Sequence, residues 1–406
     1  MITIDEAVEI VLGEAKPLPS MLMPIEDSKD YVLADPVCAD IDFPPFDRAM
    51  MDGYAIKASS SEEGTIFPVD GIISAGEYRE EPVPDGHAVK IMTGAPLPPG
   101  TDAVMQIELT SDAGDGRIRL NAKIEPGENI AKQGEEASKG SVLLPAGTVV
   151  DSAAASVMAM AGRTTVNVHR LPRVGIIPTG SELVNPSDKI PALGKIRDSN
   201  TYGLIIQCLA WRGIPIRLGN PGDDPEVLGE YIEKGLGYNI LAICGGVSMG
   251  DYDLVPGILE KLGVEIFFHK VAQKPGKPML FGKRGMNYIF GLPGNPVAAY
   301  LGFELYAGPM IRRMAGEVGF RTRWFKGVSV GNFRVSSDRA QFKPCRVEWE
   351  DRGWKVYPVA TKGSADIFSV VGTNAFGRFE KGNYTVPIGE EVDFFFTRGG
   401  LYGTHR

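Results

Sequence analysis

The sequence predicts a multidomain protein of the α/β plus β class, and three observations along its 406 residues support this. Strand-like and helix-like segments alternate over residues 171–316, which favours a central three-layer α/β domain with a mostly parallel sheet. Turn-forming residues recur every few positions over residues 41–150 and indicate a β-rich domain. After residue 316 only β-like patterns remain, which predicts a small C-terminal β-barrel.

Composition limits the function classes. A hydrophobic fraction of 43% is sufficient for packed cores, and 50 glycines with 30 prolines imply many tight turns. The net charge of −9 and the pI of about 5.2 argue against a general nucleic-acid-binding or membrane-surface protein. An anionic ligand would therefore need local basic residues to bind.

Cysteine usage and the chain start predict the compartment. The four cysteines form no C-x-x-C pair, as expected for reduced cytosolic thiols, and the four histidines suggest no zinc site. The acidic N-terminus lacks a signal-peptide pattern, and the most apolar run, residues 153–161, is too short to cross a bilayer. We therefore expect a soluble cytoplasmic protein.

The first element expected is a helix. Thr3 and Glu6 have the spacing of a capping box, and an apolar face at the helical period follows as far as about Gly13. A second helix, of small residues over 151–162, is expected to pack on the first. The β-rich domain would then be an insertion, and residues 1–40 and 151–170 would form one discontinuous stalk.

The remaining elements belong to the α/β domain and the barrel. A hairpin with its turn at 351–353 is the clearest barrel signal. Together these patterns predict domains at 1–40 with 151–170, 41–150, 171–316 and 317–406. In the α/β domain we expect strands at 173–178, 214–218, 239–244, 266–271 and 287–290, and helices at 200–211, 225–234, after 254 and after 296.

The stretch 241–253 is the most informative one. An apolar strand runs into glycines at 245, 246 and 250, which let a backbone approach a phosphate closely, and a helix follows. Asp251 and Asp253 would repel a bare phosphate but suit one that arrives with a divalent cation. The alternative is an ordinary helix start with acids favoured by the helix dipole.

A second candidate is the loop 269–278. It carries Lys270, Lys274 and Lys277 among prolines that stiffen it. In an acidic protein this arrangement indicates an oxyanion clamp. The alternative is three solvated lysines on a turn.

Further polar loops follow other strands of this domain. Glu182 can coordinate a metal or accept hydrogen bonds from a heterocycle, Asp223 lies after a third strand, and Ser199 or Asn200 is the expected N-cap of its helix. The segment 291–296 offers a shaped turn. Because such loops gather at one edge of a parallel sheet, they predict an anionic, heterocycle-bearing ligand.

The β-rich domain contributes one more candidate. Asp52 lies on a proline-anchored loop next to a Gly53 turn. From the residues alone, an Asx turn that closes this loop is the simpler explanation.

These segments resemble the molybdopterin molybdenumtransferase family, of the MoeA type that includes the gephyrin E domain. The similar segments are PPFDRAMMDGYA, KIMTGAP, GENIAKQGEE, PTGSEL, IRDSN, CGGVSMGDYD, KPGKP and LPGNPVAA, in family order over nearly the whole chain. The resemblance implies an elongated four-part subunit in a homodimer, with a cleft shared between the α/β domain of one subunit and the β-rich domain of the other. It implies insertion of molybdate into adenylylated molybdopterin, release of AMP and a need for a divalent cation, taken as Mg²⁺.

The resemblance also assigns roles to residues of this chain. Glu136 stands where the family usually carries Asp, and Cys244 where Ser is common. The dithiolene sulfurs of the ligand, not a protein cysteine, would receive the metal. The candidates are catalytic Asp52, Thr93, Glu182, Lys270, Lys274 and Lys277; ligand-binding Gly245, Gly246, Val247, Ser248, Gly250, Asp223, Pro293, Gly294, Pro296 and Ser364; and metal-binding Asp253, Asp223 and Glu182.

Three alternatives remain at this stage. The chain could be a molybdopterin adenylyltransferase, which uses the same α/β domain with a Gly-Gly-x-Ser loop, or a non-catalytic molybdopterin-binding scaffold paralogue. A generic nucleotide hydrolase is the third. An adenylyltransferase is also an expected partner of the enzyme, whereas nucleic acid and membranes are not.

Overall fold

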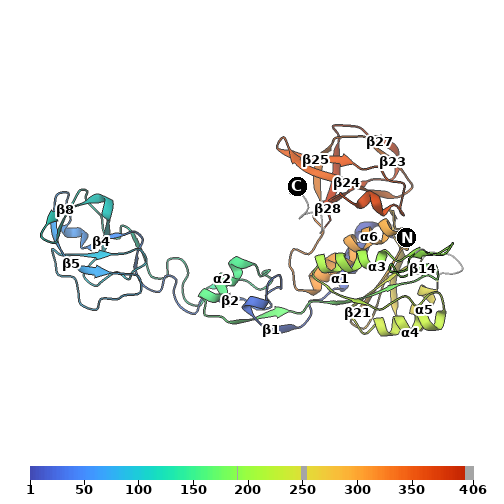
Figure 1. Ribbon diagram of the computed structural model, residues 1–406, viewed down its shortest axis with the longest axis horizontal. Helices are drawn as coiled ribbons and strands as arrows, with labels where there is room; N and C mark the ends of the chain where they lie inside the picture. Colours follow the sequence, from blue (N-terminus) through green and yellow to red (C-terminus); the bar gives the residue numbers. More distant parts are fainter. Residues whose placement is uncertain (190, 248–253, 398–406) are drawn as a thin grey trace.

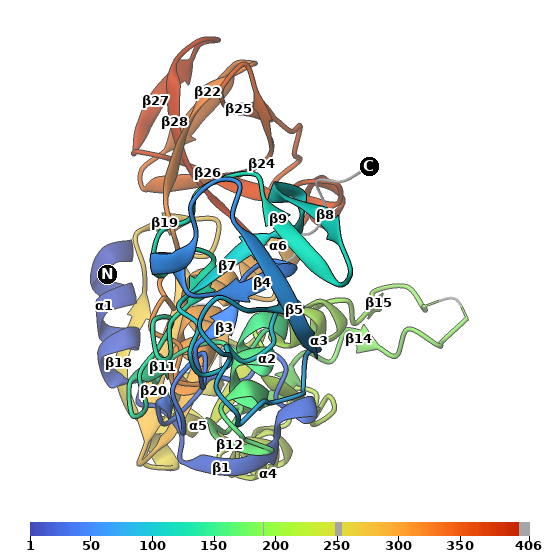
Figure 2. The same ribbon diagram turned by 90° about the vertical axis from the view of Figure 1, so that its left-hand side faces the viewer.

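The computed structural model describes residues 1–189, 191–247 and 254–397. The molecule is elongated (Figure 1). A β-rich domain lies at one end, a thin stalk follows, and an α/β domain with a β-barrel beside it forms the other end. Figure 2 looks along the molecule from the β-rich end and shows the segment around β14 and β15 projecting from the α/β domain. None of the helices in the described part combines the length and hydrophobicity of a transmembrane span.

The distal domain is built on one six-stranded sheet in the order β7-β4-β6-β5-β9-β8. Adjacent residues of its strand β4, Ala55 and Ile56, are both fully buried but belong to different apolar clusters, because successive side chains point to opposite faces. The strands are β4 (Gly53–Ile56), β5 (Ile66–Ile73), β6 (Ala88–Ile91), β7 (Ala103–Gln106), β8 (Thr110–Gly114) and β9 (Arg117–Leu120), with a small ladder of β3 (Arg48–Ala49) and β10 (Ile130–Ala131) and 3-10 turns η2 (Ala58–Ser60) and η3 (Ile107–Leu109).

The stalk consists of short paired strands and one helix. Asp151 caps helix α2 (Ser152–Met160), as its Oδ1 accepts a hydrogen bond from the Ala154 amide at 2.8 Å. Two ladders pair β1 (Ser20–Pro24) with β12 (Thr165–His169) and β2 (Val37–Cys38) with β11 (Val142–Leu144), beside the 3-10 turn η1 (Ile25–Asp27).

The expected packing of the two helices on each other is wrong. Helix α1 (Ile4–Glu14) begins with the predicted capping box, but its buried face, including Ala7 and Val11, joins the core of the α/β domain. Helix α2 instead packs through Ala154 and Met158 into a separate cluster of the stalk. The apolar face of α1 fits a large core better than the small stalk, and the sequence period alone does not say which core receives it.

The α/β domain contains a sheet in the order β16-β13-β17-β21-β20-β18, whose first four strands are parallel. Strand β17 (Ile240–Cys244) is buried throughout, with Ile240 and Ala242 facing one core and Leu241 and Ile243 the other. The other strands are β13 (Arg173–Pro178), β16 (Ile214–Arg217), β18 (Glu265–Lys270), β20 (Pro278–Arg284) and β21 (Asn287–Leu292); the helices are α3 (Asn200–Ala210), α4 (Pro225–Gly235), α5 (Val255–Lys261), α6 (Pro296–Gly302) and α7 (Gly308–Met314), the last two joined by a π-helical turn η4 (Phe303–Ala307), and β14 (Leu183–Val184) pairs with β15 (Ile196–Arg197).

Strand β20 was not among the predicted strands. It forms an antiparallel hairpin with β21 and also pairs antiparallel with β18, so the parallel part of the sheet ends at β21. The segment 270–278 connects the antiparallel strands β18 and β20, and within it β19 (Gln273–Lys274) pairs with barrel strand β24.

The C-terminal region is a closed five-stranded barrel, as predicted. Its strands follow one another in the order β24-β25-β22-β28-β26, and β26 pairs back to β24. The predicted hairpin is β24 (Ala340–Glu350) with β25 (Gly353–Pro358). The other elements are β22 (Phe325–Ser329), β23 (Phe333–Ser337), β26 (Ala375–Phe379), β27 (Gly382–Val386), β28 (Glu391–Phe396) and the 3-10 turn η5 (Ile367–Val370).

Candidate active site

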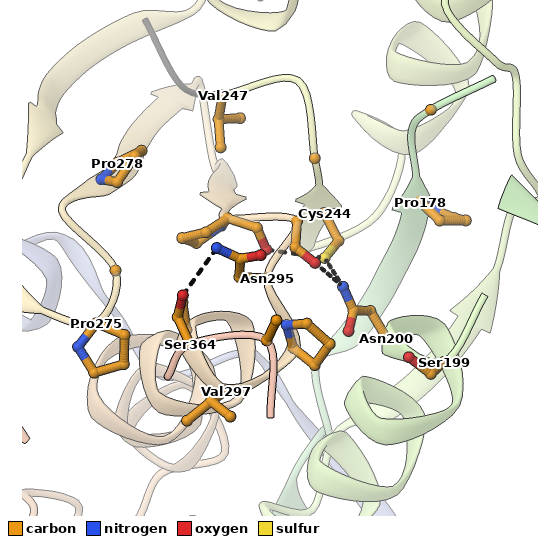
Figure 3. Close-up of a pocket in the computed structure, with 18 of the residues that line it drawn as sticks. Pro178, Ser199, Asn200, Cys244, Val247, Pro275, Pro278, Asn295, Val297 and Ser364 are labelled. Atoms are coloured by element: carbon orange, nitrogen blue, oxygen red, sulfur yellow. Dashed lines mark hydrogen bonds between the residues drawn. The ribbon is translucent and has the colours of Figure 1, made fainter. Parts of the chain in front are cut away.

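A cleft of about 1140 Å³ lies where the carboxyl ends of β13, β17 and β21 meet the barrel. Its lining combines strand-end loops of the α/β domain, the segment 273–278 and barrel residues from 339–344 and 361–365. Figure 3 shows how several of these side chains gather around the ends of the strands. This is the edge at which open α/β sheets bind ligands.

The glycine-rich turn after β17 forms one wall. Gly245 has φ +105°, and a Cβ at this position would lie 2.7 Å from the carbonyl oxygen of Thr179, so a larger residue does not fit. The Thr179 hydroxyl is buried and has no hydrogen-bond partner within the described residues. Gly246 and Val247 also line the cleft, whereas Ser248, Gly250, Asp251 and Asp253 lie outside the described residues.

The turn after β21 forms the next part of the wall. Asn200 donates a hydrogen bond to the Gly294 carbonyl at 2.7 Å, and Asn295 donates one to Ser364 Oγ at 3.0 Å (Figure 3). Because Ser364 comes from the segment that leads to η5, this contact joins the barrel region to the turn. Pro293 and Pro296 line the cleft beside it.

Ser199, one of the two residues predicted as N-cap, occupies the N-cap position of α3. The side chain of Ser199 makes no capping hydrogen bond, and the amide of Thr201 donates to Asp198 Oδ1 at 3.1 Å instead. Asp198, which is buried at the start of the helix, therefore supplies the capping hydrogen bond in place of Ser199. Asn200 is thereby left to cross-link the strand-end turns.

Cys244 is a structural residue of the cleft floor. Its Sγ accepts a hydrogen bond from Asn200 at 3.1 Å and donates one to the Pro293 carbonyl at 3.3 Å. Burial raises the pKa of this thiol to about 12. The neutral thiol is therefore a poor nucleophile at neutral pH.

Hydrogen bonds fix the position of the loop 269–278, called the lysine loop below. Buried Gln273 accepts a hydrogen bond from the Tyr306 hydroxyl and donates one to the Pro275 carbonyl at 3.2 Å. Lys274 Nζ donates to the Ser336 carbonyl of β23 at 2.8 Å. Lys274 and Lys277 line the cleft, whereas Lys270 ends β18 and is not among the lining residues.

The acidic side chains lie on the α/β side of the cleft. Glu182 and Asp223 both line it, and Asp223 Oδ2 accepts a hydrogen bond from the Ser181 amide at 2.8 Å. Among the residues that the structure describes, no group of three His, Cys, Asp or Glu side chains is close enough to hold a metal ion by itself. Any cation here would need ligands from the substrate or from residues such as Asp253.

Two basic residues on the barrel side of the cleft were not among the predicted site residues, nor was Arg197 on the α/β side. Arg339 and Lys343 of the barrel both line it. They alternate with Gln341 at the start of a strand, so their side chains share one face. The period-two spacing of polar residues at 339, 341 and 343 was the available signal, but nothing in the sequence says that this face meets the α/β domain.

Asp52 and Thr93 are brought together, but not in this cleft. Asp52 Oδ1 accepts hydrogen bonds from the backbone amide and the hydroxyl of Thr93, each at 2.7 Å. The amide hydrogen bond, followed by the hydroxyl one, lowers the pKa of Asp52, so its carboxylate is charged at neutral pH. Both residues flank strands of the distal domain, at the far end of the molecule from the cleft (Figure 1). Nearby, Glu136 forms an ion pair with Arg48 at 2.8 Å.

Three family models match the chain in order. They are described as the MoeA N-terminal region (domain I and II), over residues 2–162, a probable molybdopterin binding domain, over 175–313, and the MoeA C-terminal region (domain IV), over 328–396. Together they cover the distal domain, the stalk, the α/β domain and most of the barrel.

Relatives match over nearly the full length. Proteins named molybdopterin molybdenumtransferase from Bacillus subtilis (strain 168) and Staphylococcus aureus (strain MRSA252) are 36% and 31% identical to the chain, each covering 98% of it and 94% and 96% of the relative. Among solved structures, a molybdopterin biosynthesis MoeA protein from Pyrococcus horikosii superposes with a TM-score of 0.83 at 30% identity, covering 98% of this chain and 99% of that one.

Proposed function

The chain belongs to the molybdopterin molybdenumtransferase family of molybdenum cofactor biosynthesis, and from this premise we propose that its cleft inserts molybdate into adenylylated molybdopterin with release of AMP. One observation carries the proposal. A glycine turn that would accept a phosphate lines the same cleft as Lys274 and Lys277, in a chain whose net charge is −9. In an acidic protein, a local group of basic side chains is expected where an anion binds.

In this proposal the residues neutralise charge and form no covalent bond with the substrate. Cleaving a phosphoanhydride beside a doubly charged oxyanion requires positioning and electrostatic stabilisation more than a nucleophile. Lys274 and Lys277 hold molybdate, while the turn from Gly245, continuing to Ser248, holds the phosphate of the pterin. Pro293, Gly294, Pro296 and Ser364 shape the adjoining part of the wall, and the dithiolene sulfurs of the ligand receive the metal.

A divalent cation fits the acidic side of the cleft. Mg²⁺ is commonly held by one or two carboxylates together with substrate phosphates, and Glu182 and Asp223 supply two. Asp253 is the third proposed ligand. Mg²⁺ bound there would reduce the negative charge that develops on the phosphates.

The distal pair makes sense in a homodimer. Asp52 and Thr93 lie in a different domain from the cleft, so we propose that they complete the cleft of a second copy of the chain. The exposed, charged carboxylate of Asp52 would then face the substrate. The domain limits proposed from the sequence are kept except for helix α1, which packs in the core of the α/β domain and not in the stalk. The catalytic role of Lys270 remains a proposal.

The setting of the reaction follows from its chemistry. Adenylylated molybdopterin must come from an adenylyltransferase, which we propose as a transient partner. The four cysteines are free thiols, which supports a reducing compartment such as the cytoplasm.

The reaction is tested by measuring AMP release. Purified chain, adenylylated molybdopterin and Mg²⁺ are titrated with molybdate and then tungstate, and the product is assayed on a cofactor-free molybdoenzyme. We expect AMP release that depends on molybdate and a product that activates the acceptor. ATP-dependent turnover would favour the adenylyltransferase alternative, and tight ligand binding without release would favour a scaffold.

A further inference from the structure

The barrel presents a row of polar side chains to the cleft. Strand β24 places Gln341 and Lys343 on one face, and Phe342 between them is buried in the core cluster of the α/β domain while also bordering the cleft. Both polar residues line the cleft. Their position depends on the backbone of the barrel and not on a flexible loop.

The lysine loop is fixed against the same strand. Lys274 is paired with Gln341 in the β19–β24 ladder. Gln341 Oε1 accepts a hydrogen bond from the Ser336 amide at 3.2 Å, while the Ser336 carbonyl accepts the hydrogen bond from Lys274 Nζ. These contacts hold the ammonium of Lys274 on the same wall as Lys343.

The ammonium of Lys343 is half-buried and unpaired. Within the described residues it forms no ion pair and no hydrogen bond, whereas Lys132, Lys283 and Lys326 each have a carboxylate partner. Desolvation, and after it repulsion by Lys274, lowers the pKa of Lys343. Such a group destabilises the empty protein, and a bound anion would relieve both effects.

We propose that Lys343 is a further anion-binding residue, which together with Lys274 and Lys277 binds a tetrahedral oxyanion on the barrel side of the cleft. The oxyanion is either molybdate or the phosphate of the nucleotide portion of the substrate. The inference rests on the proposed function and adds to it a third ammonium group that the lysine loop does not contain.

The affinity of the cleft for the oxyanion should depend on pH. An anion beside Lys343 stabilises its protonated form and raises the pKa that is lowered in the empty protein. Above that lowered pKa, binding must be accompanied by proton uptake, so affinity falls as pH rises. Arginine stays protonated over this range, and Lys343→Arg should remove this part of the pH dependence.

The test measures binding of molybdate alone and of AMP alone to the full chain by calorimetry, from pH 7 to pH 10. Lys343→Gln should weaken binding of at least one of them about tenfold at pH 7, as for the loss of one charge-assisted hydrogen bond. The control is Lys381→Gln, which removes an exposed lysine of the same barrel outside the cleft and should change neither affinity. Thermal unfolding confirms that each variant is folded.

The outcomes distinguish the sources and the proposals. Weakened binding of molybdate only, or of AMP only, identifies the oxyanion, and retention of affinity at high pH by Lys343→Arg supports the charge mechanism. If the wild-type chain binds both ligands and Lys343→Gln binds them equally well, the inference is wrong and the proposed function stands. If the wild-type chain binds neither, the inference is wrong, and the AMP-release assay alone decides the proposed function.

Discussion

At the scale of residues, the acidic side chains of the cleft and most of its basic side chains lie on different sides, with Arg197 of β15 as the basic residue on the acidic side. Glu182 and Asp223 lie on the α/β side, while Lys274 and Lys343 lie toward the barrel. An oxyanion and a cation-bound phosphate can therefore lie side by side without either meeting a wall of its own sign. Cys244 lies on the floor of the cleft, where burial raises the pKa of its thiol and keeps it neutral.

The first prediction concerns Cys244. Serine can accept the hydrogen bond from Asn200 and donate to the Pro293 carbonyl, so Cys244→Ser should keep AMP release within about twofold and change the free energy of unfolding by about 1 kcal/mol. Activity and thermal unfolding are measured together. A folded variant without cofactor formation would make this cysteine catalytic after all.

The second prediction concerns the clamp. Lys274→Ala removes an ammonium group from the cleft and should raise the molybdate concentration needed for half-maximal AMP release by about tenfold or more. Titrating molybdate with the variant and the wild type tests it. An unchanged molybdate dependence would contradict the clamp.

At the scale of elements, the ends of helices and strands determine where functional groups lie. Helix α1 starts at a complete capping box: the Glu6 amide donates to Thr3 Oγ1 at 3.2 Å, and the Thr3 amide donates to Glu6 Oε2 at 2.7 Å. The same helix start lies next to the lysine loop, because the Ile2 amide donates to the Lys270 carbonyl at 3.2 Å.

The third prediction tests that helix start. Thr3→Ala removes the capping side chain and should destabilise the first turn of α1 by about 1 kcal/mol, which corresponds to about fivefold faster local hydrogen exchange. Exchange mass spectrometry of the peptide that contains α1 measures it. Thr385→Ala, on exposed strand β27, serves as the control and should leave this peptide unchanged. Equal exchange in Thr3→Ala and wild type would show that tertiary packing alone fixes the helix start.

At the scale of the whole molecule, the stalk separates two groups of proposed site residues. The cleft lies between the α/β domain and the barrel, whereas Asp52 and Thr93 lie in the distal domain (Figure 1). A single elongated subunit does not bring these groups together. Two copies that exchange their distal ends would do so and form two equivalent shared sites.

The fourth prediction tests the shared site by mixing Asp52→Ala and Lys274→Ala at a molybdate concentration well below the raised half-maximal value of Lys274→Ala. Under this condition each variant alone should release little AMP, but a mixed dimer has one site with both wild-type groups. Random exchange should therefore restore about a quarter of the wild-type AMP release. The exposed position of Asp52 also predicts a nearly unchanged melting temperature for Asp52→Ala. Exchange without any recovery would place both residues in one site of the same chain.

The sequence could predict the elements whose signals are local. The capping box of α1, the all-apolar strand β17 and the β24–β25 hairpin turn each depend on residues close in the chain. Strand β20 was not predicted, because lysines, prolines and glycines surround its apolar residues and hide the strand pattern. Its pairing with β21 depends on the hairpin and is visible only in the tertiary structure.

The sequence by itself determined the fold class, because glycine turns, strand ends and charged loops are encoded in short segments. From these segments and their resemblance to a family it also predicted the order of domains and most of the proposed site residues. Only the tertiary structure decided that α1 joins the α/β core, that Arg339 and Lys343 of the barrel reach the cleft, and that Asp52 and Thr93 do not. These facts depend on contacts between residues far apart in the chain. Local hydrophobic periods specify which face of an element is buried, but not which neighbour buries it.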